Sequence, residues 1–282
     1  MTEPPTAHPP RLVDALITDL DGTFWSPSMG VHEESHRVVD SLDEAGITFV
    51  IATGRRAQSA LNGLRPAGYA PRPGILMNGA VVRERLDGES FLVQDIETAI
   101  AEHVLRVFRG AGVEPVAYVD DPETDMIYGP DSDASSAYLA NTVGYRLVDS
   151  FDEHLAASTV IGFGAFGFDY DLLQPIADEI NSLKIATAVI GRSLYEGGHG
   201  IMVQGPAIDK QTGITAWCER SGTSLDRLAV VGDGNNDIEM LSAARIAIVP
   251  SNAAPEIREL ADEIIAPNED GGWEAIPEIL GL

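Results

Sequence analysis

This sequence of 282 residues contains very little cysteine and no long apolar segment. Its single cysteine, Cys218, excludes an internal disulfide, and its place in an apolar stretch favours packing over chemistry. No apolar run approaches the roughly 18 residues that a membrane-spanning helix needs. Residues 1–10 lack the apolar core of a secretory signal and are expected to form a disordered tail. Together these absences predict a globular protein of the cytoplasm.

Positive charge is also scarce in this chain. Lys184 and Lys210 are its only lysines, and 44 acidic residues stand against 18 basic ones, which gives a net charge of −26. Such a surface repels nucleic acid and anionic membranes, so neither is expected as a partner. Because it also repels anionic substrates, a phosphate site here must rely on a metal ion, backbone N–H groups and a few placed cations.

Short apolar runs typical of buried parallel strands alternate with stretches of helical spacing in two parts of the chain. This order predicts a doubly wound parallel sheet of the Rossmann-like α/β class, in which ligands bind beyond the carboxyl ends of the strands. The predicted strands are residues 12–18, 47–52, 74–77, 228–231 and 246–249, and the predicted helices are residues 33–45, 56–64, 208–220 and 238–244.

The middle of the chain has a different pattern, in which hairpin-like, helical and strand segments surround a polar, loop-rich stretch at 120–150. This mixture of helical and strand segments indicates an α+β module inserted into the first domain. We therefore predict a sheet domain made of residues 11–84 and 204–282, and an inserted domain made of residues 85–203.

Two carboxylates follow the first predicted strand, in the stretch Asp19-Leu20-Asp21-Gly22-Thr23. Side chains two positions apart in an extended segment point to the same side, so Asp19 and Asp21 can converge on one point. Carboxylates that close repel each other unless a cation lies between them, and Mg²⁺, which prefers oxygen ligands, suits that place. Taken alone, the stretch is equally well explained as an acidic turn, because Asp-Gly is common in turns.

A second acidic cluster follows the predicted strand at 228–231. It supplies further carboxylates at the same edge of the sheet, although a glycine-rich turn with Asp237 as a helix N-cap would account for it locally. Two acidic clusters at the ends of parallel strands are much harder to explain as turns than one. The cluster reads Gly232-Asp233-Gly234-Asn235-Asn236-Asp237.

Two further elements are suited to phosphate. Thr53-Gly54-Arg55 follows the second predicted strand and precedes a helix, where a hydroxyl and backbone N–H groups form a ready anion site. Lys210 lies near the start of another predicted helix, and a point-charge ammonium there suits a phosphoryl oxygen. Each element alone has an ordinary explanation, as an N-cap and as a surface lysine.

Taken together, these segments resemble the haloacid dehalogenase-like phosphatases. The match covers Asp19–Thr23, residues 52–55, Lys210 and residues 232–237, in this order over nearly the whole chain. Asn78-Gly79-Ala80 and the stretch Asn268-Glu269-Asp270-Gly271-Gly272 are similar to the Cof-type branch, whose inserted domain is a type IIB cap.

The resemblance implies a role for each matching residue. Asp19 would attack phosphorus to form an aspartyl-phosphate, and Asp21 would protonate the leaving alkoxide and then activate water. The phosphoryl group would be held by Thr53, Gly54, Lys210 and Asn236, and Mg²⁺ by Asp19, the backbone carbonyl of Asp21, Asp233 and Asp237.

The expected function is that of a Mg²⁺-dependent phosphatase for a small phosphorylated metabolite, with sugar phosphates as one candidate class. A sugar phosphomutase sharing this cap type and a non-catalytic module that binds a phosphorylated metabolite are the alternatives. Intact Asp19 and Asp21 favour catalysis over binding alone. The chain is expected to act as a monomer or homodimer, and the sequence leaves open whether Trp25 or His199 contacts the substrate.

Overall fold

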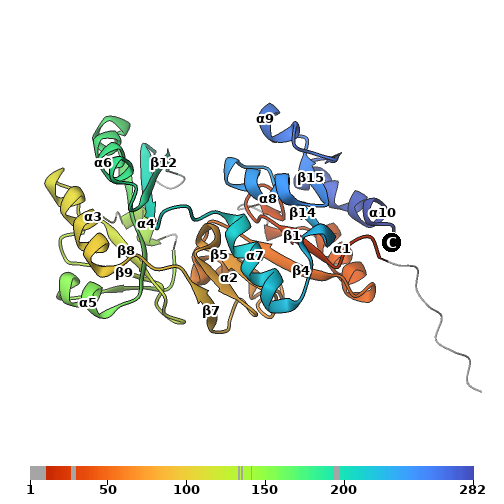
Figure 1. Ribbon diagram of the computed structural model, residues 1–282, viewed down its shortest axis with the longest axis horizontal. Helices are drawn as coiled ribbons and strands as arrows, with labels where there is room; N and C mark the ends of the chain where they lie inside the picture. Colours follow the sequence, from red (N-terminus) through yellow and green to blue (C-terminus); the bar gives the residue numbers. More distant parts are fainter. Residues whose placement is uncertain (1–10, 27–29, 133, 135, 141, 194–196) are drawn as a thin grey trace, which may run out of the picture. The chain divides into compact units, whose positions relative to one another are not determined.

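The computed structural model describes residues 11–26, 30–132, 134, 136–140, 142–193 and 197–282 (Figure 1). The tail predicted at 1–10 lies outside the described residues. The chain forms two compact units. The first unit comprises Met1–Thr53, Arg72–Gly74 and Lys210–Leu282, and the second comprises Gly54–Pro71 and Ile75–Asp209.

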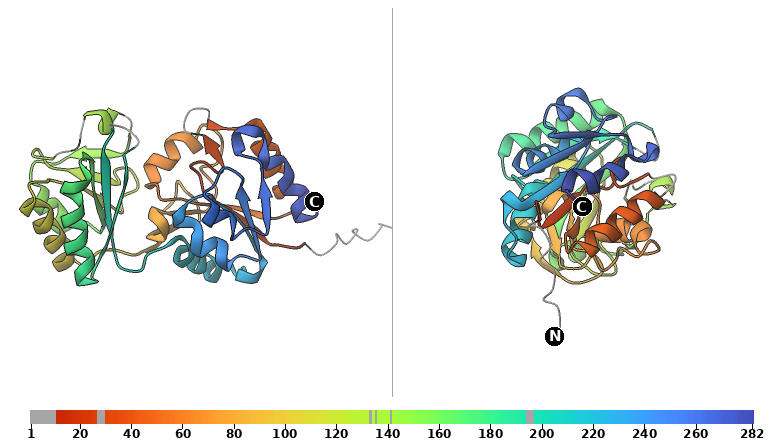
Figure 2. Two further views of the ribbon diagram at one scale, coloured as in Figure 1. Left: turned by 90° about the horizontal axis from the view of Figure 1, so that it is seen from above. Right: turned by 90° about the vertical axis from the view of Figure 1, so that its right-hand side faces the viewer.

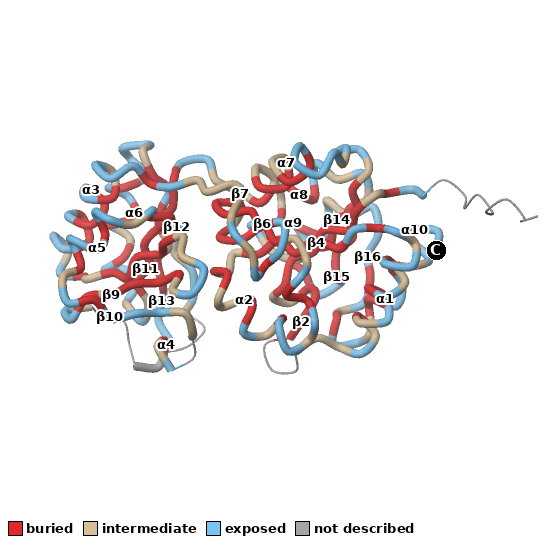
Figure 3. Tube along the Cα trace, turned by 90° about the horizontal axis from the view of Figure 1, so that it is seen from below, coloured by how far each residue is buried: buried red, intermediate tan, exposed pale blue. Residues whose placement is uncertain are grey.

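The first unit is built on parallel strands, as the apolar runs predict. Nearly all of their residues are buried, which agrees with a sheet covered on both faces (Figure 3). In spatial order the strands are β16 (Glu263–Ile265), β15 (Ile246–Pro250), β14 (Leu228–Val231), β1 (Ala15–Thr18) and β4 (Thr48–Ala52), and each is parallel to its neighbour.

Helices lie on both faces of this sheet, so the predicted doubly wound α/β class is confirmed (Figure 2). Helix α1 packs against β4 and α10, whereas α7 contacts α8, which in turn contacts β14 and β15. The helices are α1 (Glu33–Glu44), α7 (Lys210–Ser221), α8 (Ile238–Ala243), the short α9 (Pro255–Arg258) and α10 (Ile276–Leu280).

A short two-stranded ribbon follows β1 and contacts the 3-10 turn at Asn268–Asp270 near the C-terminal part of the chain. The sequence pattern does not predict this ribbon. Its strands are β2 (Trp25–Ser26) and β3 (Gly30–Val31), which pair antiparallel. The indole Nε1 of Trp273 donates to the carbonyl of Thr23 at 2.8 Å, and the ring of Trp273 packs on Phe24 at a centroid distance of 4.9 Å. This packing fixes the turn that follows β1.

The second unit contains a six-stranded sheet with helices α3, α5 and α6 on one face (Figure 2). Its core is formed by the apolar residues that these helices and the sheet bury between them. The order of strands is β10 (Tyr145–Leu147), β9 (Met126–Tyr128), β8 (Val116–Val119), β11 (Val160–Phe168), β13 (His199–Gln204) and β12 (Thr187–Arg192). The helices are α3 (Thr98–Gly110), α4 (Ser136–Ala140), α5 (Phe151–Ala157) and α6 (Tyr170–Leu183).

The stretch expected to be loop-rich at 120–150 carries β9, α4 and β10. The sequence does not predict the two strands, because three residues are too few to show a periodic pattern. The second unit also includes α2 (Ala57–Leu64), the hairpin β6 (Val81–Arg83) and β7 (Ser90–Val93), and most of β5 (Gly74–Leu76). Contacts thus group these elements with the inserted segment, and the predicted division at 84/85 and 203/204 stays a prediction.

A buried ion pair explains part of this grouping. The guanidinium of Arg56, just before α2, binds the carboxylate of Asp125, whose second oxygen accepts the backbone N–H of Gln58 at 2.7 Å. The same guanidinium donates to the carbonyl of Val143 at 2.7 Å. Helix α2 is therefore tied to the inserted segment by charge as well as by packing.

Within the described part of the chain, every helix is too short or too polar to cross a lipid bilayer.

We expect Trp273→Ala to destabilise the first unit by about 3–5 kcal/mol, because it removes a fully buried ring from an aromatic cluster. Trp273→Phe keeps most of the packing but leaves the Thr23 carbonyl without its indole donor, and we expect it to cost about 1–3 kcal/mol. Urea denaturation followed by circular dichroism measures both. No loss in Trp273→Phe would contradict the role given to the hydrogen bond, and equal losses in the two variants would contradict the role given to the packing of the ring.

Candidate active site

The site begins at the carboxyl end of β1, which lies between β14 and β4 in the sheet of the first unit. Asp19 follows the last residue of β1, and its backbone N–H donates to Val231 O, at the end of β14, at 2.9 Å. The residue is 6% exposed. Asp19 is therefore a carboxylate fixed at the edge of a parallel sheet, where ligands bind in such folds.

The turn after Asp19 is closed by its own backbone. The N–H groups of Phe24 and Trp25 both donate to Leu20 O at 3.0 Å. Gly22 has a φ of +83°, and a Cβ there would lie 2.6 Å from Asp233 Oδ2. A side chain at this position would be strained and would also displace Asp233, so glycine is required for two separate reasons.

The loop after β14 folds around the carboxylate of Asp237. Oδ2 of this side chain accepts the backbone N–H of Asp233 at 3.0 Å and that of Gly234 at 2.9 Å. Asp233 is held from the other side, because Thr23 donates its hydroxyl to Asp233 Oδ1 at 2.6 Å. Residues 235–237 form a 3-10 turn before α8, and Asp237 occupies the N-cap position of α8 without a side-chain capping bond to that helix.

Lys210, the first residue of α7, lies between two of these carboxylates. Its Nζ binds Asp237 Oδ1 at 2.6 Å and also binds Asp19 Oδ1. The lysine side chain is fully buried, so the alternative of an ordinary surface lysine is wrong. An ammonium group so placed neutralises part of the charge that the carboxylates bring together.

The close packing of these buried charged groups shifts the pKa values of Asp19, Asp233 and Lys210. Burial, opposed by Lys210 but reinforced by Asp237 and Asp233, raises the pKa of Asp19 from 3.8 to about 7. Burial also raises the pKa of Asp233, although the hydroxyl of Thr23 acts in the opposite direction. The pKa of Lys210 is raised because Asp19 and Asp237 together outweigh the effect of its burial.

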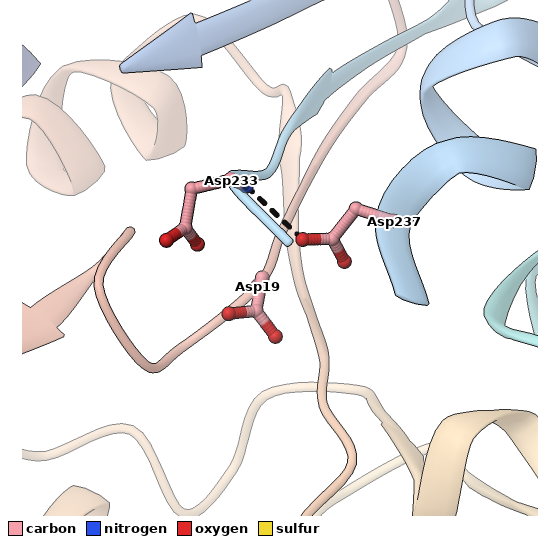
Figure 4. Close-up of side chains that lie close together, drawn as sticks. All are labelled: Asp19, Asp233 and Asp237. Carbon is pink, nitrogen blue, oxygen red and sulfur yellow. Dashed lines mark hydrogen bonds between the residues drawn. The ribbon is translucent and has the colours of Figure 1, made fainter. Parts of the chain in front are cut away.

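These carboxylates have the composition of a metal site. Asp19, Asp233 and Asp237 each offer an oxygen, and the three oxygens lie within 4.8 Å of one another (Figure 4). Only one ammonium group, that of Lys210, pairs with them among the described residues, so the three carboxylates retain two negative charges. A hard divalent cation with oxygen ligands fits both the donor set and this residual charge.

The side chain of Asp21 is not one of the three carboxylates of this cluster. Its Oδ1 accepts a hydrogen bond from the indole Nε1 of Trp25 at 3.0 Å. The sequence-based prediction assigns only the backbone carbonyl of Asp21 to the metal, and that assignment stays a prediction, as does the catalytic role of its side chain.

The predicted phosphate ligands are placed as follows. Thr53 directly follows β4 and is buried, and Asn236 lies exposed in the turn before α8. Gly54 belongs to the second unit, where a Cβ would lie 2.9 Å from Asn78 Oδ1. Their contribution to phosphate binding stays a prediction, as does that of Lys210. His199 lies in β13 beside the ring of Tyr170, at a centroid distance of 5.3 Å.

Two residues of the site are not assigned a role from the sequence. Thr23 orients Asp233, and Trp25 binds Asp21. Both lie in or next to the first acidic motif, so their position along the chain indicates that they lie near the site. Their partners, Asp233 and Asp21, are set only by the fold.

The chain matches the family model of the haloacid dehalogenase-like hydrolases over residues 16–275 and belongs to that family. The resemblance found in the sequence is thereby confirmed, and so is the prediction that the chain is a hydrolytic enzyme of this family.

Named relatives cover most of this chain at low identity. Phosphoglycolate phosphatase of Methanopyrus kandleri is 25% identical over 265 residues, which are 92% of this chain and 94% of that protein. The chloroplastic endoribonuclease YBEY of Arabidopsis thaliana is 23% identical over 93% of this chain, but the chain spans only 45% of that longer protein.

Solved structures agree in fold. The structure of TM0651 from Thermotoga maritima has a TM-score of 0.80 at 22% identity, covering 95% of this chain and 97% of that one. The sugar phosphatase BT4131, described as a member of HAD subclass IIB, has a TM-score of 0.74 at 23% identity, covering 95% of this chain and 99% of that one. This chain therefore shares its fold with these structures.

We expect Asp19→Asn to stabilise the metal-free protein in neutral and mildly alkaline buffer. A carboxyl whose pKa rises from 3.8 in the unfolded chain to about 7 in the folded one makes stability fall as the pH rises through that window. Asparagine carries no charge and so avoids this loss of stability. At pH values above this window, the variant should melt at a temperature roughly 2–8 °C higher than the wild-type protein.

Thermal melting of both proteins in chelator across this pH range is the measurement. The advantage of the variant should disappear below the window, where Asp19 is protonated in both states. Asp40→Asn, which removes an exposed charge from α1, is the matched control and should show no such pH dependence. A less stable Asp19→Asn protein at neutral pH would mean that the ion pair with Lys210 outweighs the burial cost.

Proposed function

We propose that this chain is a Mg²⁺-dependent phosphatase in which Asp19 attacks the phosphorus of a small phosphate monoester. The observation that carries the proposal is the buried carboxylate of Asp19 at the end of β1, bound by Lys210 and grouped with Asp233 and Asp237. A carboxylate nucleophile that attacks an anionic phosphate needs a positive charge nearby, such as that of Lys210, because the surface as a whole repels the substrate.

The proposed reaction has two steps. In the first, an oxygen of Asp19 displaces the alcohol from phosphorus, which gives an aspartyl-phosphate, while Asp21 donates a proton to the departing oxygen. In the second, Asp21 takes a proton from water, and the water attacks the aspartyl-phosphate to release phosphate and restore Asp19. Lys210, Thr53, Gly54 and Asn236 hold the phosphoryl oxygens in both steps.

The metal ion is part of the proposal. Asp19, Asp233, Asp237 and the carbonyl of Asp21 would hold Mg²⁺, whose charge offsets the repulsion between nucleophile and substrate. Thr23 and the backbone N–H groups of Asp233 and Gly234 fix the orientation of the carboxylates and so prepare the site in advance.

The substrate class rests on the relatives. Phosphoglycolate and sugar phosphates are the substrates implied by the names of the proteins compared above, and both are small phosphate monoesters. A small phosphorylated metabolite is therefore the proposed partner. A cytoplasmic location and a monomeric or homodimeric state stay predictions from the sequence.

Asp19→Asn should abolish the release of phosphate from a panel of phosphorylated metabolites and from an aryl phosphate, with a loss of roughly a thousandfold or more. The carboxamide is nearly isosteric but a far weaker nucleophile. Asp40→Asn should retain full activity. Turnover that survives in Asp19→Asn would refute the assignment of the nucleophile.

Removing divalent ions with a chelator should stop phosphate release, and adding Mg²⁺ should restore it. The same assay, run on a hexose 1-phosphate with the products separated, distinguishes hydrolysis from transfer. Appearance of the 6-phosphate without free phosphate would favour the phosphomutase over the phosphatase. Tight binding of a metabolite without turnover across the panel would favour a binding module.

A further inference from the structure

The side chain of Trp25 is buried against the candidate active site and directed at Asp21. The residue is 6% exposed, and its indole Nε1 lies 3.0 Å from Asp21 Oδ1. Its backbone N–H donates to Leu20 O at 3.0 Å, and its carbonyl accepts the N–H of Gly22 at 3.3 Å. The indole is thus fixed by the turn that carries both Asp19 and Asp21.

The ribbon strand that carries Trp25 is itself held in place. Trp25 pairs with Val31 across the ribbon, and the hydroxyl of the next residue, Ser26, donates to Glu269 Oε1 at 3.1 Å. The short 3-10 turn that supplies Glu269 runs from Asn268 to Asp270. A ring anchored at both its backbone and its neighbour has little freedom to leave Asp21.

In the hydrogen bond between Trp25 and Asp21, the chemistry of the two groups decides which one donates. An indole N–H can only donate, so Oδ1 of Asp21 is the acceptor whether the carboxyl group is ionised or neutral. Because a carbonyl oxygen accepts more strongly than a hydroxyl oxygen, this bond favours a neutral Asp21 that carries its proton on Oδ2. An acid that serves a leaving oxygen must present its proton at hydrogen-bond distance with the correct alignment, and rotation of the carboxyl group would spoil that alignment.

We propose that Trp25 is a positioning residue that sets the orientation of the Asp21 carboxyl group through the indole N–H, so that Oδ2 is the oxygen that exchanges the proton with the leaving group. This inference rests on the proposed function, because it assumes that Asp21 is the acid.

The test compares substrates that differ in their need for an acid. Trp25→Phe keeps an aromatic ring but removes the N–H, and kcat/KM should fall roughly 10- to 100-fold for an alkyl phosphate, whose alkoxide needs a proton. For an activated aryl phosphate, whose phenolate leaves without one, the fall should be less than about threefold. The inhibition constant of inorganic phosphate should be unchanged, which shows that the pocket is intact.

Ser26→Ala is the matched control, because it loosens the same ribbon but keeps the indole donor. Any loss in this variant should be equal for the two substrates. Equal losses for both substrates in Trp25→Phe would overturn the proposal in favour of a structural role, and no loss for either would show that the indole donor has no part in the reaction.

A second measurement needs no turnover. The ¹H–¹⁵N resonance of the Trp25 indole, assigned by its absence in Trp25→Phe, should move upfield in Asp21→Ala, which removes the acceptor. An unmoved resonance would refute the hydrogen bond on which the proposal stands. Activity that survives in Asp19→Asn would instead refute the proposed function, so the two failures are distinguishable.

Discussion

The first unit is organised around one buried ammonium group. Lys210 binds Asp19 and Asp237 at once, and in doing so joins the end of β1, the start of α7 and the loop after β14. Without that cation the carboxylates would repel one another in a poorly solvated space. The burial of the lysine is favourable only because two carboxylates meet it there, so the charges are mutually dependent.

The same arrangement implies a conflict between stability and reactivity. A carboxylate cluster that keeps two negative charges after pairing with Lys210 is costly in the empty protein, and the raised pKa of Asp19 expresses that cost. A carboxylate that is buried, partly desolvated and close to a cation is also well prepared to attack phosphorus. Proteins commonly accept such strain at the residues that perform chemistry.

The sequence alone predicts the parallel sheet and the identity of the acidic clusters. Buried parallel strands give continuous apolar runs, and the carboxyl ends of those strands are marked by Asp19, Thr53 and Asp233. It does not predict the three-residue strands β9 and β10, because a periodic pattern needs a longer segment. Nor does it predict the pairs Trp25–Asp21 and Thr23–Asp233, since the first depends on a tight turn and the second joins residues 210 positions apart.

The separation of the site along the chain has a consequence for synthesis on the ribosome. The turn that carries Asp19 is translated first, but Lys210 lies 191 residues later and the indole that caps Thr23 lies 250 residues later. A growing chain therefore contains Asp19 long before Lys210 and Trp273 have been made. The buried charge cluster, and the packing of the turn that carries it, can form only after residue 273 has been added to the chain.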